Sequence, residues 1–236
     1  MKVLITGADR GLGLFLTEKM LKRHYTVFAG QYMPEHQELN DLQQQFPETL
    51  HLIPLDVGSD ESVKNARFQV EKITDQLDVL IGNAAIIGWN DHIIRKMTDT
   101  QMMADVYNVN AIGNVRVVEH FLPLLEAGSE RKICLVSSEA GSIGECERDN
   151  FFWYAMTKSA LNQYAKIMFN RHRPDGFKFR LYQPGWMKTH MRGYVDTHAD
   201  LTPERAASLA ADYLFDKEIN EDELVLWSYE GRKMAF

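Results

Sequence analysis

Short, almost uniformly apolar runs alternate along the chain with longer amphipathic segments. The runs have the length and composition of buried strands and lie at 3–5, 26–29, 50–55, 79–81, 133–136, 177–182 and 224–227. The amphipathic segments repeat apolar residues every three or four positions, as helices do; they begin near residue 11, span 36–46, 59–74 and 99–125, include Tyr154, and open again at Thr202. The chain therefore alternates between predicted strands and predicted helices.

This alternation predicts an α/β fold. Strands that are apolar throughout are typical of a parallel sheet with both faces covered, and short connections then give a doubly wound sheet. No repeat and no Pro/Gly/Ser-rich linker marks a boundary, so we expect one domain over residues 1–236 with seven strands.

Composition and charge exclude several classes of function. The formal net charge is −7, so the basic footprint of a nucleic-acid-binding protein is missing. Two cysteines, Cys134 and Cys146, make neither a disulfide scaffold nor a metal site, and the histidines lack the spacing of metal ligands. No run approaches the roughly 18–20 apolar residues of a membrane span. We expect a cytoplasmic protein without metal, nucleic-acid partner or membrane segment.

A glycine-rich turn follows the first predicted strand. Its glycines, at 7, 11 and 13, allow a sharp turn and the close approach of a ligand, and the next helix directs free N–H groups and its positive dipole end at the same place. These features predict a pyrophosphate site, with ordinary tight turning as the alternative. The turn reads Thr6-Gly7-Ala8-Asp9-Arg10-Gly11-Leu12-Gly13.

The segment after the second strand favours NADP(H) over NAD(H). An NAD site commonly has an acidic residue there for the ribose 2′-hydroxyl, whereas residues 29–32 read Ala-Gly-Gln-Tyr. Arg10 in the glycine turn could bind a 2′-phosphate, unless it is an exposed loop charge. Asp56, after the third strand, could accept a hydrogen bond from the adenine amino group or simply cap the next helix.

Tyr154 and Lys158 lie one helical turn apart, so both side chains occupy one face of the predicted helix. An ammonium beside a phenol favours the phenolate and lowers a pKa that is ordinarily about 10. Such a pair could move a proton at neutral pH. Taken alone, it also occurs by chance on many surface helices.

These motifs, in this order, resemble the short-chain dehydrogenase/reductase family over nearly the whole chain. Besides the glycine turn, the matching positions are Asp56-Val57, Gly82-Asn83-Ala84-Ala85, Asn110, Ser138, Tyr154 with Lys158, and Pro184-Gly185-Trp186 with Thr189. The closing residues 227–232 are similar to the small carbonyl reductases of the C-factor/sniffer type. The resemblance implies a Rossmann sheet of strand order 3-2-1-4-5-6-7. The residues that it implies at the cofactor are Gly7, Asp9, Arg10, Gly11, Leu12, Gly13, Asp56, Val57, Asn83, Ala84, Tyr154, Lys158, Pro184, Gly185, Trp186 and Thr189.

The resemblance also implies catalytic roles. Tyr154 would exchange a proton with a carbonyl or alcohol oxygen, and Lys158 would lower the Tyr154 pKa and bind the nicotinamide ribose. Ser138 would hold the substrate oxygen, and Asn110 would join a water-mediated proton relay toward Lys158. The chain has a few extra residues, 145–150, between Ser138 and Tyr154, so Ser137 and Ser142 stay alternatives to Ser138.

The function so implied is an NAD(P)-dependent oxidoreductase acting on a small carbonyl or alcohol. A cofactor-binding signalling protein with little turnover is the alternative. The resemblance also implies that copies of the chain form a homodimer or homotetramer through residues 99–125 and 152–171. Residues 187–201 are expected to form a mobile lid. An apolar substrate pocket, or alternatively core, is expected from Ile86, Ile87, Trp89, Phe152, Trp153, Trp186, Met187 and Met191.

Overall fold

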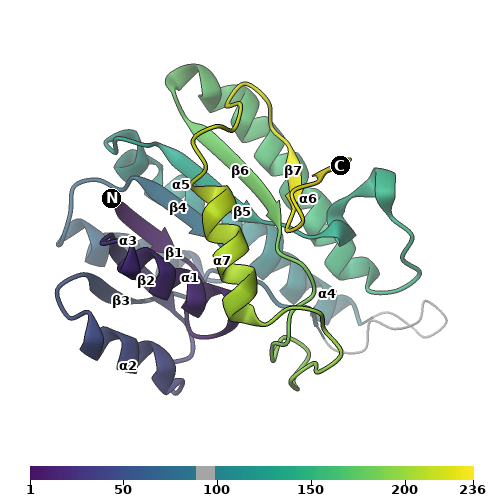
Figure 1. Cartoon of the computed structure of the whole chain (residues 1–236), viewed down its shortest axis with the longest axis horizontal. Coiled ribbons are helices and arrows are strands. Elements are labelled where there is room, and N and C mark those ends of the chain that lie inside the picture. Colours follow the sequence, from purple (N-terminus) through teal and green to yellow (C-terminus); the bar gives the residue numbers. More distant parts are fainter. Residues whose placement is uncertain (89–98) are drawn as a thin grey trace.

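The computed structural model describes residues 1–88 and 99–236. Within them, one sheet holds eight strands in the order β3-β2-β1-β4-β5-β6-β7-β8 (Figure 1). The strands are β1 (Lys2–Ile5), β2 (Thr26–Gln31), β3 (Leu50–Pro54), β4 (Val79–Gly82), β5 (Lys132–Val136), β6 (Lys178–Gln183), β7 (Leu226–Ser228) and β8 (Lys233–Met234).

The first seven strands are parallel and confirm the predicted order. Leu4 of β1, for example, lies opposite Phe28 of β2 and Leu80 of β4. The sequence did not predict β8, which pairs antiparallel with β7 and sets Met234 opposite Leu226. A two-residue strand is too short to produce an alternating pattern. The sheet is therefore mostly, not wholly, parallel.

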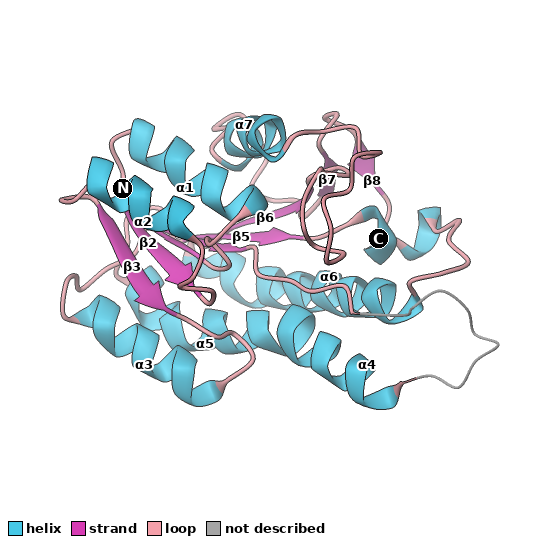
Figure 2. Ribbon diagram, turned by 90° about the horizontal axis from the view of Figure 1, so that it is seen from below, coloured by secondary structure: helices cyan, strands magenta, loops and turns pink. Residues whose placement is uncertain are grey.

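Helices cover both faces of the sheet. Figure 2 shows α1, α2 and α7 on one face and α3, α4, α5 and α6 on the other. The helices are α1 (Gly11–Lys22), α2 (Gln37–Gln45), α3 (Asp60–Glu71), α4 (Thr100–Tyr107), α5 (Gly113–Glu126), α6 (Phe152–His172) and α7 (Pro203–Leu214), with short turns η2 (Glu139–Gly141), η3 (Ile143–Glu145) and η4 (Arg173–Asp175). A buried apolar cluster lies on each side of the sheet, one including Leu16 and the other Phe121. This explains why the strands are apolar on both faces.

The helix predicted at 99–125 contains an irregular turn. A π-helical segment, η1 (Asn108–Ile112), joins α4 to α5 and carries the buried Asn110. Such turns occur often at functional sites because they reorient one or two residues within a helix. No helix in the described part of the chain is long and apolar enough to cross a membrane.

Candidate active site

The glycine turn is tied to the end of the neighbouring strand β4. The Thr6 hydroxyl accepts hydrogen bonds from the main-chain N–H groups of Asn83 and Ala84, each at 3.0 Å. The Asn83 amide donates in return to the carbonyl oxygens of Thr6 at 2.9 Å and Gly7 at 3.0 Å. The carboxyl ends of β1 and β4 are thus fixed together where the strand order reverses, the place at which doubly wound sheets bind ligands.

Two of the three glycines leave no room for a side chain. Gly7 has φ +63°, and a Cβ there would lie 2.9 Å from Ala84 Cα; at Gly13 it would lie 2.1 Å from the Gly7 oxygen. Gly11 is more open, with the Thr189 methyl group 3.5 Å from such a Cβ. The structure therefore brings the predicted Thr189 against the glycine turn, although the two are far apart in sequence.

The first turn of α1 fits a phosphate. Arg10 precedes the helix with extended backbone (φ −157°), and its side chain does not cap the helix N–H groups. Among the described residues, the Arg10 side chain has no hydrogen bond or ion pair. The side chain of Leu12 packs in the core, with 6% of the residue's surface exposed, so its predicted place beside the cofactor stays a prediction for its main-chain N–H group. Free N–H groups, a helix dipole and a cation together can hold an anion.

Asp9 brings a carboxylate to the end of β2. It is 4% exposed, and Oδ1 accepts hydrogen bonds from the main-chain N–H groups of Tyr32 at 3.0 Å and Met33 at 2.9 Å. The resemblance had placed Asp9 at the cofactor as part of the glycine turn, but we had sought the acidic residue of an NAD site in the segment after β2 and not in this turn.

Asp56 does not cap α3. Its Oδ1 accepts from the Gly58 N–H at 2.8 Å, while the Ser59 hydroxyl accepts from the Ser62 N–H and begins the helix as predicted. The next residue, Val57, is buried, and its carbonyl oxygen accepts from Arg116 at 2.7 Å. Asp56 and Val57 therefore form an ordered turn at the carboxyl end of β3.

Tyr154 and Lys158 share the inner face of α6. The Lys158 side chain is buried; its Nζ lies 5.7 Å from the centre of the Tyr154 ring and donates to the Val136 carbonyl oxygen at 2.8 Å. Ser138 lies close enough to Tyr154 for its hydroxyl to lower the pKa of the phenol. The structure thus brings three of the four predicted catalytic side chains together at the end of β5.

The two alternative serines are committed elsewhere. The Ser137 hydroxyl donates to Asn162 Oδ1 at 2.6 Å, and that of Ser142 donates to the Ala235 carbonyl oxygen. Ser138 is the serine beside Tyr154. Gly141 keeps it there, because a Cβ at this glycine would lie 2.7 Å from the Lys158 carbonyl carbon.

Burial dominates the electrostatics of the pair. It raises the pKa of Tyr154 to about 12; the Glu139 charge acts in the same direction, and Ser138 and Arg148 act against it. Burial lowers the pKa of Lys158 to about 8. The expected lowering of the Tyr154 pKa by Lys158 is therefore not the main effect in the protein without cofactor.

Asn110 fixes the elements around the pair. Its side chain is fully buried and exchanges two hydrogen bonds with Ile86, each at 2.8 Å, and donates to Thr157 Oγ1 at 3.1 Å. It joins the segment after β4 to α6, one residue before Lys158. Thr157, which sequence reasoning missed, is part of this arrangement.

Sequence reasoning also missed Glu139 and Arg148. Glu139 Oε2 accepts a hydrogen bond from the Ser138 hydroxyl at 2.6 Å, and its other carboxylate oxygen contacts Arg148 Nη2. An acidic residue directly after the candidate serine was the available signal. Arg148 belongs to the extra residues 145–150, which therefore reach back to the site.

The predicted lid is a loop that closes on itself. It leaves β6 through the buried Pro184 and through Gly185 (φ +84°), and Met187 pairs with Leu201 at its base. Arg192 lies over the rings of Phe151 and Trp186, 5.2 and 5.6 Å from their centres. The loop is thereby joined to the start of α6.

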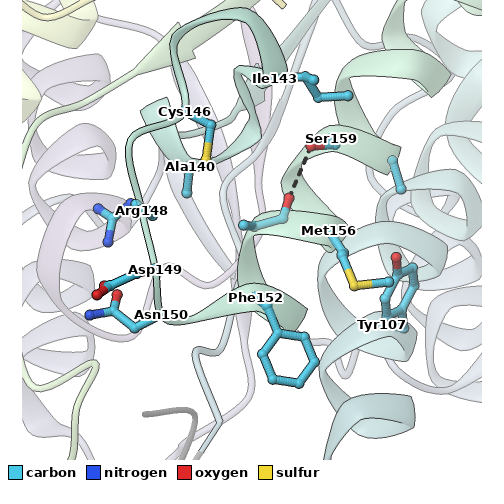
Figure 3. A pocket seen from close by; sticks show the side chains of 12 residues that line it. Tyr107, Ala140, Ile143, Cys146, Arg148, Asp149, Asn150, Phe152, Met156 and Ser159 are labelled. Carbon is cyan, nitrogen blue, oxygen red and sulfur yellow. Dashed lines mark hydrogen bonds between the residues drawn. The ribbon is translucent and has the colours of Figure 1, made fainter. Parts of the chain in front are cut away.

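The predicted apolar residues are divided among different environments. Trp153 is buried and its Nε1 donates to the Ile87 carbonyl oxygen at 3.1 Å, so it behaves as core. Trp186 is 45% exposed in the closing loop, and Trp89 lies outside the described residues. Phe152 lines a cavity of about 580 Å³ between α6 and the loop carrying Cys146–Asn150 (Figure 3). The remaining lining residues are Tyr107, Ala140, Ile143, Ala155, Met156, Ser159 and Ala160.

Known proteins resemble this chain over its full length. An uncharacterized oxidoreductase of Schizosaccharomyces pombe is 29% identical over 251 residues, covering 99% of this chain and 96% of its own. The NADPH-bound carbonyl reductase from chicken fatty liver is 28% identical, with a TM-score of 0.87 and coverage of 100% and 98%. The carbonyl reductase Sniffer of D. melanogaster shares the fold at 24% identity, with a TM-score of 0.88 and coverage of 100% and 99%.

The family model of the short chain dehydrogenases matches residues 1–200. Together with the Rossmann-type sheet and the joined ends of β1 and β4, this match identifies the chain as an oxidoreductase of the short-chain dehydrogenase/reductase family.

Proposed function

We propose that the protein transfers a hydride between NADP(H) and a small carbonyl or alcohol, with Tyr154 as the general acid and base. One observation carries this proposal: the buried Lys158 places its Nζ 5.7 Å from the centre of the Tyr154 ring, at the end of the sheet that carries the glycine turn, and Ser138 lies close enough to lower the Tyr154 pKa. A phenol and a hydroxyl aimed at one point can bind a carbonyl oxygen and protonate it.

The cofactor supplies the hydride when bound, and the chain supplies binding, orientation and the proton. Gly7, Gly11 and Gly13 leave backbone N–H groups accessible to the pyrophosphate. Tyr154 gives its proton to the substrate oxygen during reduction and recovers it during oxidation. Lys158, held by Val136, keeps a positive charge next to the phenol, and Ser138 positions the oxygen.

Arg10 supports NADP(H) as the cofactor. It is the cation at the start of α1 without a partner among the described residues, and the similar carbonyl reductase from chicken fatty liver binds NADPH. If Arg10 binds the 2′-phosphate, Arg10→Ala lowers the NADPH/NADH ratio of kcat/KM, whereas Lys22→Ala at the far end of α1 leaves it unchanged. An unaltered ratio in Arg10→Ala would overturn the cofactor assignment.

A panel of aldehydes and ketones, measured with NADPH and NADH, tests the reaction. Tyr154→Phe should bind the cofactor as the wild type does and lose roughly a hundredfold or more in turnover. Tight cofactor binding without turnover, unchanged by Tyr154→Phe, would instead support the signalling alternative.

A further inference from the structure

Glu139 lies directly against the hydroxyl that would hold the substrate oxygen. Ser138 Oγ donates to Glu139 Oε2 at 2.6 Å and accepts from the Ala140 N–H at 3.1 Å. A hydroxyl has a single proton to donate. In the protein without substrate, the Ser138 proton is therefore committed to the Glu139 carboxylate.

The carboxylate is charged and accessible. Burial raises the Glu139 pKa, but hydrogen bonds from Ser138 and Arg148 outweigh this effect and hold it below its ordinary value. The Glu139 side chain is 41% exposed and that of Arg148 is 37% exposed. Arg148 also lines the cavity beside α6, so the ion pair connects Glu139 to that cavity (Figure 3).

When a carbonyl oxygen accepts the hydrogen bond from Ser138, Glu139 loses that hydrogen bond. The Glu139 carboxylate then keeps Arg148 but has only water in place of the Ser138 donor. A simple ketone offers no replacement. A substrate with a hydroxyl on the carbon next to the carbonyl does, because Glu139 Oε2 lies 2.6 Å from Ser138 Oγ and is therefore within reach of a second oxygen close to the one that Ser138 binds.

We propose that the site selects α-hydroxy carbonyl compounds, with vicinal diols as the products, and that Glu139 is the specificity-determining residue that accepts the neighbouring hydroxyl. This inference rests on the proposed oxidoreductase function. Arg148 fixes one carboxylate oxygen and leaves the other for Ser138 or the substrate. Substrates with a carboxylate next to the carbonyl are disfavoured, because they would set two negative charges side by side.

Hydroxyacetone and butanone provide a matched test, since they differ by a hydroxyl in place of a methyl group. In the wild type, kcat/KM should favour hydroxyacetone at least about tenfold, which corresponds to about 1.4 kcal/mol. In Glu139→Ala this preference should fall to near unity while butanone is still reduced, because Ser138 is then free. Loss of structure would lower both rates together.

Two variants keep the outcome interpretable. Glu139→Gln retains the size and an acceptor oxygen and should show an intermediate preference even if Glu139→Ala folds poorly. Glu147 is an exposed acid next to Arg148 in the sequence, and Glu147→Gln should show the same preference as the wild type. Equal rates for the two ketones in the wild type, or a preference that Glu139→Ala and Glu139→Gln both retain, would overturn the specificity role alone. Failure of the wild type to reduce any carbonyl would overturn the proposed function and this inference with it.

Discussion

Lys158 Nζ donates a hydrogen bond to the Val136 carbonyl oxygen at 2.8 Å, and this contact fixes the ammonium on the end of β5. The side chain is 2% exposed, and burial lowers its pKa from 10.5 to about 8. The fold therefore holds a cation where desolvation disfavours charge. Such a group destabilises the native state and is explained by function more readily than by packing.

Lys158→Met should stabilise the protein at pH 7 while it removes turnover. A pKa shift from 10.5 to about 8 corresponds to about 3 kcal/mol, of which about 1 kcal/mol is offset because Val136 loses a donor. Urea unfolding should therefore show a net gain of about 2 kcal/mol.

The same gain should shrink as the pH rises. Between about pH 8 and 10.5 the unfolded chain keeps the Lys158 proton and the folded chain does not, so the wild type becomes more stable across this window. Lys64→Met, at an exposed position of α3, should show no such trend. If Lys158→Met is less stable than the wild type at pH 7, burial of the Lys158 ammonium does not destabilise the native state.

The Tyr154 phenol should stay protonated in the cofactor-free protein up to at least pH 10. Burial raises its pKa to about 12, and the Glu139 charge adds to this effect. Tyr154→Phe removes the part of the near-ultraviolet tyrosinate signal that belongs to Tyr154. In the wild type this part should appear only at pH values above those at which ordinary tyrosines ionise. Titration of that signal near neutral pH would mean that Lys158 outweighs burial even without cofactor.

The positions of the strands and of the motifs could be predicted because each depends on local sequence, whereas the order of the strands followed from the family resemblance. Apolar runs mark the strands, and Gly7, Tyr154 and Lys158 stand at fixed distances from them. The roles of Asp9 and Glu139 could not be predicted in this way. Each acts through a contact set by the path of the chain: Asp9 meets Tyr32 across the sheet end, and Glu139 meets Arg148 from an inserted loop.

Asn110 provides a prediction about stability. Asn110→Ala removes the three hydrogen bonds of a buried amide, two with the main chain of Ile86 and one with Thr157, so we expect a loss of about 3 kcal/mol in the free energy of unfolding. Asn65→Ala, on the exposed face of α3, should change stability by less than about 0.5 kcal/mol. If Asn110→Ala unfolds at the wild-type urea concentration yet loses turnover, Asn110 acts in the reaction and not in holding α6.

Asp9 and Arg10 should act on cofactor preference in opposite directions. The Asp9 carboxylate lies at the end of β2, where the adenosine ribose binds in doubly wound sheets, and its charge opposes a 2′-phosphate. Asp9→Asn keeps an oxygen that can accept from Tyr32 and Met33 but removes the charge. The NADPH/NADH ratio of kcat/KM should rise at least about fivefold, because even a well-solvated pair of charges interacts by about 1 kcal/mol. Glu18→Gln, in the body of α1, should leave the ratio as it is. A fall in the ratio for Asp9→Asn would show that Asp9 supports NADPH binding through the shape of the turn, and that its charge is unimportant.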